Sequence, residues 1–168
     1  MRQILSELFE LLTEQKTILS NLIKLSEEER QVIVKGEPEK LETVVRAELK
    51  ELSKLGAIEK KRTALYPAIY EELGIPNKDI TVSAIAANAL PDERDAITKL
   101  QTELTSLIDR HTRLNLENRE LIKEHLDYTE AVLELMVDPE DPLNNFYSGD
   151  GKAVQEKKKS TGFFDKRA

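Results

Sequence analysis

The sequence predicts an elongated all-α protein, in which three long antiparallel helices form a bundle or coiled coil. The main observation is a row of residues spaced alternately by 3 and 4 between Ile97 and Leu135, which keeps one stripe of a long helix facing a partner. No Gly or Pro lies between Pro91 and Pro139, so this helix would be about 70 Å long. The composition, with 34% charged residues and 5% aromatics, also favours long helices over a thick core. The row comprises Ile97, Leu100, Leu104, Leu107, His111, Leu114, Asn118, Leu121, His125, Tyr128, Val132 and Leu135.

The first long helix is expected over residues 3–35. It carries an apolar row with a second row beside it, and so wide a face suits a helix that touches two neighbours. The two rows are Ile4, Leu8, Leu11, Gln15, Ile18, Leu22, Leu25, Glu29 and Val32, and Leu5, Leu12, Leu19 and Ile33. Gly36 follows as the favoured left-handed cap, and Pro38 restarts the chain as a helix, which the short connection makes antiparallel to the first.

The second long helix is expected over residues 38–73. Its row is polar in the middle, and we expect Glu59 and Arg62 to form an ordinary ion pair within the helix. Pro67 predicts a kink or a break near residues 65–67. The row is Leu41, Val45, Glu48, Leu52, Leu55, Glu59, Arg62, Tyr66, Ile69 and Leu73, flanked by Val44, Leu49, Ile58 and Leu65.

Two shorter parts complete the predicted organisation. A small apolar stretch, residues 80–90, contains one short helix over about 82–89, capped by Thr81 or Ser83. This stretch serves either as a plug of the core or as part of a binding groove, and the plug is the preferred reading. The third long helix covers 91–137 and ends the helical domain, 1–137. Residues 138–168 have the composition of a flexible tail.

Composition excludes several classes of function. The net charge of −7 argues against binding to nucleic acid or to an anionic membrane surface. There is no Cys, no secretory signal pattern and no apolar run long enough for a membrane span, so we expect a cytoplasmic protein. Nucleophile, phosphate-binding and metal-binding patterns are missing. We therefore expect no enzyme activity and no cofactor.

Polar residues on the third long helix are expected to be structural. His111 and His125 lie about 21 Å apart along the axis, too far to share a metal ion, and neither follows a Glu at the spacing of di-iron bundles. We expect both to be seam histidines with satisfied hydrogen bonds. Asn118 is expected to fix the register of the seam, and Tyr128 to lie on it.

Residues 114–122, LNLENRELI, give the third long helix a distinctive element. This element, the two preceding Glu- and Leu-rich helices joined at 35–38, the stretch 80–85 and the tail segments 146–151 and 163–168 resemble the FlgN family of flagellar type III export chaperones. The family's long helix carries an N-x-x-N-R-x-L-L element, matched here by Asn115, Asn118, Arg119 and Leu121. Ile122 replaces the second Leu, which is a conservative departure.

The resemblance implies a cytoplasmic chaperone. Such a protein would bind the C-terminal amphipathic segment of the hook-associated proteins FlgK and FlgL and deliver them to the cytoplasmic domain of the export gate. We expect a monomer or weak dimer. The alternative is a structural coiled-coil adaptor that oligomerises through its seam and has no secreted client.

Two groups of residues are candidates for contacting these partners. The tail is either a plain disordered terminus or a carrier of aromatic anchors, and the resemblance implies that Tyr147 docks the export gate. The stretch before the third long helix supplies the second group. The candidates are Phe146, Tyr147, Phe163 and Phe164 in the tail, and Ile80, Val82, Ile85 and Leu90 in the stretch.

Overall fold

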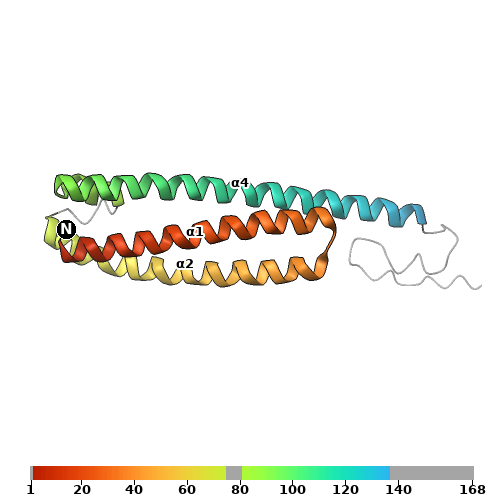
Figure 1. The fold of residues 1–168 in the computed structure, drawn as a ribbon, viewed down its shortest axis with the longest axis horizontal. Coiled ribbons are helices and arrows are strands. Elements are labelled where there is room, and N and C mark those ends of the chain that lie inside the picture. Colours follow the sequence, from red (N-terminus) through yellow and green to blue (C-terminus); the bar gives the residue numbers. More distant parts are fainter. Residues whose placement is uncertain (1, 75–80, 137–168) are drawn as a thin grey trace, which may run out of the picture. The chain divides into compact units, whose positions relative to one another are not determined.

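The computed structural model describes residues 2–74 and 81–136, which form four helices. They are α1 (Gln3–Lys35), α2 (Pro38–Leu73), α3 (Val82–Asn88) and α4 (Pro91–Met136), as Figure 1 shows. The chain divides into two compact units, residues 1–124 and 125–168, and α4 continues from the first into the second. The predicted tail, residues 138–168, lies outside the described residues.

Local signals place the helix ends. Gly36 has φ +67° and donates its N–H to the Ile33 carbonyl, and Glu37 N–H reaches Val32, so the left-handed cap expected after α1 is present. Thr81 caps α3, because its hydroxyl oxygen accepts from Ala84 N–H at 3.0 Å. At the start of α4, Glu93 reaches back to accept the Leu90 N–H at 3.2 Å.

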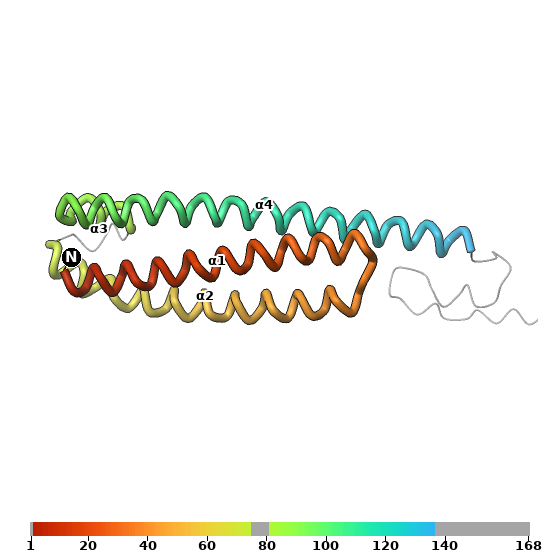
Figure 2. Tube along the Cα trace, viewed as in Figure 1, coloured from red at the N-terminus to blue at the C-terminus, as the bar shows by residue number. Residues whose placement is uncertain are grey.

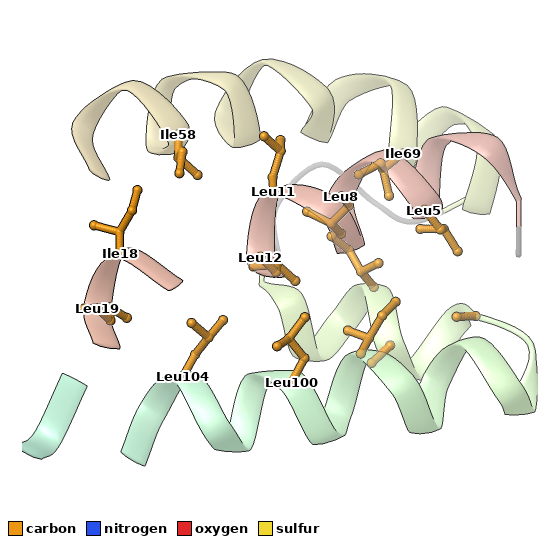
Figure 3. Close-up of a cluster of buried hydrophobic side chains, with 14 of the residues drawn as sticks. Leu5, Leu8, Leu11, Leu12, Ile18, Leu19, Ile58, Ile69, Leu100 and Leu104 are labelled. Carbon is orange, nitrogen blue, oxygen red and sulfur yellow. The ribbon is translucent and has the colours of Figure 1, made fainter. Parts of the chain in front are cut away.

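The apolar core is built around the first half of α1, and its members come from all four helices. Figure 3 shows Leu11 and Ile18 on the side of Ile58 in α2, whereas Leu12 and Leu19 lie on the side of Leu100 and Leu104 in α4. The width of the α1 face therefore serves two neighbours. The buried cluster is Leu5, Leu8, Leu11, Leu12, Ile18, Leu19, Leu22, Ile58, Ile69, Tyr70, Ile85, Ala86, Ala89, Ile97, Leu100 and Leu104.

Side-chain contacts give the directions of the long helices within the first unit. From α1 to α2 the residue numbers run in opposite directions: Gln15 contacts Arg62, Asn21 contacts Glu51 and Ser26 contacts Glu48. From α1 to α4 they rise together, in the ion pairs Lys16–Glu103, Glu27–Arg110 and Arg30–Glu117. Thus α2 runs antiparallel to α1, whereas α4 runs parallel to it, and α1 lies between them (Figure 1).

The face that α2 turns to α1 differs from the row that the sequence predicts. Val44 and Ile58, expected at the flank, are buried. Val45 and Leu52, expected in the seam, are exposed. Both rows on α2 repeat at heptad spacing, so spacing alone does not tell which row faces the neighbour. The result is an apolar row on α2 that the described part of the chain leaves uncovered.

The helix α2 is not broken at Pro67. Its helical hydrogen-bonded structure continues to Leu73, and Figure 2 shows the trace curving near this end. Glu59 and Arg62 form the expected ion pair, at 2.6 Å. Arg62 also lies over the ring of Tyr66, 6.0 Å from its centroid, so its charge is held between a carboxylate and an aromatic face.

Candidate functional site

A group of four polar residues, three of them buried and Glu48 half-buried, joins the three long helices, and we call it the polar layer. It comprises Ser26 and Glu29 of α1, Glu48 of α2 and Asn118 of α4. Asn118 donates from Nδ2 to the Ser26 carbonyl at 2.8 Å and to Glu29 Oε2 at 2.7 Å. The Ser26 hydroxyl donates to Glu48 Oε1 at 2.9 Å. The side chain of Asn118 reaches two neighbouring positions of α1, Ser26 and Glu29. These hydrogen bonds fix the position of α4 along α1.

The polar layer is electrostatically costly. Burial raises the pKa of Glu48, the hydrogen bond from Ser26 acts in the opposite direction, and the nearby carboxylate of Glu29 raises it further. Asn118 is only 2% exposed, and its Oδ1 has no hydrogen-bond partner among the described residues. Such an orphaned acceptor costs about 1 to 3 kcal/mol. A layer of this kind selects one arrangement of the helices at the expense of stability.

The Asn–Arg element of α4 lines a shallow surface groove of about 480 Å³ beside this layer. Asn115, Asn118, Arg119 and Ile122 of the element face the groove, together with Glu29 of α1. The remaining lining residues are His111, Thr112 and Leu116. The element that carries the family resemblance therefore has both a packing role, through Asn118, and an accessible rim.

His111 is half-buried on the seam of α4. The amide nitrogen of Asn115 lies 3.0 Å from His111 Nε2, so the exposed Asn one turn later satisfies the ring. Burial lowers the pKa of His111, which favours the neutral imidazole at pH 7. His125 and Tyr128 differ, because both are exposed and Tyr128 shows 72% of its surface. The predicted seam role of these two residues is therefore not supported by burial.

The last twelve residues of α4 carry an apolar face of their own. At 100° per residue, the large apolar side chains all fall in one half of the helix surface, together with His125 and Thr129. The other half carries Asp127, Glu130 and Glu134. The exposed members of the apolar half, which we call the α4 face, are Leu126 (64% exposed), Tyr128, Leu133 (56%), Leu135 (87%) and Met136 (78%). Exposed apolar side chains gathered on one side of a helix indicate a surface for a partner.

The predicted partner-binding residues fall into three groups. Ile85 is fully buried in the core, so its side chain is not available to a partner in this structure, and Val82 packs against the same core. Leu90 is 58% exposed. Ile80, Phe146, Tyr147, Phe163 and Phe164 lie outside the described residues. The sequence pattern does not predict the exposed α4 face, because the row through Tyr128, Val132 and Leu135 indicates a seam that continues to Leu135.

Two further properties concern the described residues only. They contain no group of three or more His, Cys, Asp or Glu side chains arranged to hold a metal ion. No helix within residues 2–74 and 81–136 combines the length and the apolar character needed to cross a bilayer.

Comparison with known proteins gives one family and one distant relative. The family model described as "FlgN protein" matches residues 1–155. The "Uncharacterized protein YvyG" of Bacillus subtilis (strain 168) is 26% identical over 148 residues, which is 88% of this chain and 89% of YvyG. No solved structure matches.

Proposed function

The chain belongs to the FlgN family, and from this premise we propose that it captures an amphipathic helix of a hook-associated protein on the exposed α4 face. FlgN proteins are flagellar export chaperones for hook-associated proteins, and they are not enzymes. We propose that its clients are the C-terminal segments of FlgK and FlgL, and that it delivers them to the cytoplasmic domain of the export gate. The protein would act in the cytoplasm, as a monomer or weak dimer.

The exposed α4 face is the observation that carries this proposal. Leu126, Leu133 and Met136 lie on one side of the helix at spacings of seven and three residues, so this side can pack against the apolar side of a partner helix. The terminal helix of a filament-type protein has such an apolar side, which has no partner before the protein is assembled. A chaperone that covers this apolar side prevents aggregation. The acidic half of the same segment favours a client helix whose flanks are basic.

The proposal also fits the division of the chain. We propose that the helical part, residues 1–137, is a coiled-coil bundle in which α2 runs antiparallel to both α1 and α4, and that residues 138–168 form a separate tail. In this reading Tyr147 and the aromatic residues around it contact the gate, while α4 contacts the client. Binding of the gate domain by a Tyr147→Ala variant at unchanged affinity would remove the gate role from the tail.

The α4 face is tested by titration calorimetry. The ligand is a peptide of about 40 residues from the C-terminus of each hook-associated protein. We expect the Leu133→Asp variant to bind at least tenfold more weakly than the unchanged chain, because a carboxylate replaces an aliphatic anchor that would be buried on binding. The matched control is Ala131→Asp, which adds the same charge on the polar half of the same helix, and it should bind within about twofold.

The remaining outcomes separate the alternatives. Equal weakening by both variants would mean that charge alone matters and would remove the α4 face as the client site. No binding by the unchanged chain would contradict the client assignment. If, in addition, sedimentation showed a stable oligomer that Leu133→Asp dissociates, the protein would be a coiled-coil adaptor.

A further inference from the structure

A second uncovered apolar surface lies on α2, in the first unit. Val45, Leu49 and Leu52 follow one another at spacings of four and three, so they share one side of the helix. They are 37%, 60% and 43% exposed. We call these three residues the α2 row. The α1-facing side of α2 is formed by other residues, Val44, Glu48 and Glu51 among them, so the row has no partner within the described chain.

Gly56 continues the α2 row by one more turn. Glycine in the interior of an exposed helix costs about 1 kcal/mol relative to alanine. No packing within residues 2–74 and 81–136 accounts for it, because a Cβ placed on Gly56 would meet nothing there within 4 Å. A missing side chain next to exposed Leu52 leaves a depression along the row, where the backbone of another helix can approach closely. Gly56 is thus a second, independent indication of a partner.

The charges beside the row show which chemistry the partner has. Helical spacing places Lys60 and Arg46 next to the α2 row, on the side of the row that is farther from α1. Lys50 lies farther round the helix in the same direction. The nearby acids are already engaged within α2, since Glu42 pairs with Arg46 and Glu59 with Arg62. Lys50 and Lys60 have no ion-pair partner in the described part of the chain. The protein as a whole has a net charge of −7, but the charges beside the α2 row that form no ion pair with described residues are positive.

The size of the row argues against a second copy of this chain as its occupant. A stable dimer buries about 800 Å² on each partner, and three partly covered aliphatic side chains offer much less. The positive borders of two copies would also face each other. A single helix fits better, because its apolar anchors match the spacing of Val45, Leu49 and Leu52, and acidic residues at its flank would complement Lys50 and Lys60.

We propose that the α2 row is a docking site for an amphipathic helix of another protein that presents leucine-type anchors with acidic flanks, and that Gly56 allows the two backbones to approach closely. This surface lies on a different helix from the α4 face and favours the opposite charge in its partner. It gives the chaperone a second interaction surface, whether or not α4 binds the client.

The test uses the full-length protein and two designed helical peptides of 18 residues. Both carry leucines at spacings of three and four; one has Glu at the flanking positions and the other has Lys. Fluorescence anisotropy at low salt should show that the Glu peptide binds more tightly than the Lys peptide to a protein carrying Leu133→Asp, in which the α4 face is disabled. Leu49→Gln should weaken the Glu peptide about tenfold or more. Val34→Gln, at an equally exposed residue of α1, is the matched control and should leave its affinity unchanged.

Two variants test the features that are specific to this surface. Gly56→Ala should raise the melting temperature and yet weaken the Glu peptide severalfold, a combination that a purely structural glycine would not give. The double change Lys50→Glu and Lys60→Glu should reverse the preference between the peptides. The inference is overturned if the Glu peptide does not bind, if Leu49→Gln and Val34→Gln behave alike, or if Leu49→Gln dissociates a dimer of the protein.

Discussion

Asn118 donates both amide hydrogens to α1, and its carbonyl oxygen accepts no hydrogen bond from the part of the chain that the structure describes. The sequence predicts part of this, because a lone Asn on a heptad row is typical of a residue that fixes register. It does not predict the partners. Ser26 lies outside the predicted rows of α1. Glu29 and Glu48 lie on the predicted rows, but no pattern pairs them with Asn118 or Ser26. These residues come together only when three helices pack in one register. The sequence of a single helix does not predict that register.

Asn118→Asp tests the polar layer. The change removes the two donors and places a carboxylate against the carboxylate of Glu29, so we expect the free energy of unfolding to fall by about 2 to 4 kcal/mol at pH 7. Urea unfolding followed by circular dichroism measures it. Asn115→Asp, at the exposed Asn of the same element, should change it by less than about 0.5 kcal/mol. Similar losses at both positions would mean that the layer is not specific.

The long helices were predicted from their spacing and their end signals, and each helix of the structure lies within a residue or so of its expected range. Gly36, Pro38, Thr81 and Pro91 supply those signals locally. The orientation of α2 about its own axis was predicted less well. Its Val44 row and its Val45 row are both apolar, and the choice between them depends on packing against α1. The exposure of the second row is what makes α2 a candidate surface.

Two glycines should respond in opposite ways to the same substitution. Gly36 has φ +67°, where a Cβ is strained, so Gly36→Ala should lower the free energy of unfolding by about 1 kcal/mol. Gly56 lies inside an exposed helix, so Gly56→Ala should raise it by up to about 1 kcal/mol. Thermal unfolding of the two variants checks the pair. Stabilisation by both changes would show that α1 does not need its left-handed cap.

Contacts distant in sequence hold the first unit together at its N-terminal end. Glu93 is 3% exposed and accepts the Arg2 backbone N–H at 2.6 Å, as well as the Leu90 N–H. These hydrogen bonds, with the nearby Arg2 guanidinium, lower the pKa of Glu93. One carboxylate therefore caps α4 and fixes the start of α1. A sequence pattern can predict the capping, but the link to Arg2 appears only in the folded chain.

Glu93→Gln should lower the free energy of unfolding by about 1 to 3 kcal/mol at pH 7. The two backbone donors bind different carboxylate oxygens, whereas an amide has one oxygen and turns its NH2 group toward the other donor. The lowered pKa sets the sign of the pH dependence. The contribution of Glu93 is present above its unfolded-state pKa and is lost as the pH falls through its folded-state pKa. The difference between the two proteins should thus shrink in acid. Glu120→Gln, at an exposed site, should show no such difference, and a gap that persisted in acid would contradict the electrostatic explanation.

The Glu93 contact and the polar layer also constrain how related chains can differ in length. Both join α1 to α4, which run in parallel: 24 positions separate Arg2 from Ser26, and 25 separate Glu93 from Asn118. An insertion between these points in one helix would pull one of the two contacts out of register unless the other helix gained the same number of residues. Relatives that keep both contacts should therefore lengthen or shorten α1 and α4 together, by whole heptads, while changes beyond Asn118 are free of this coupling.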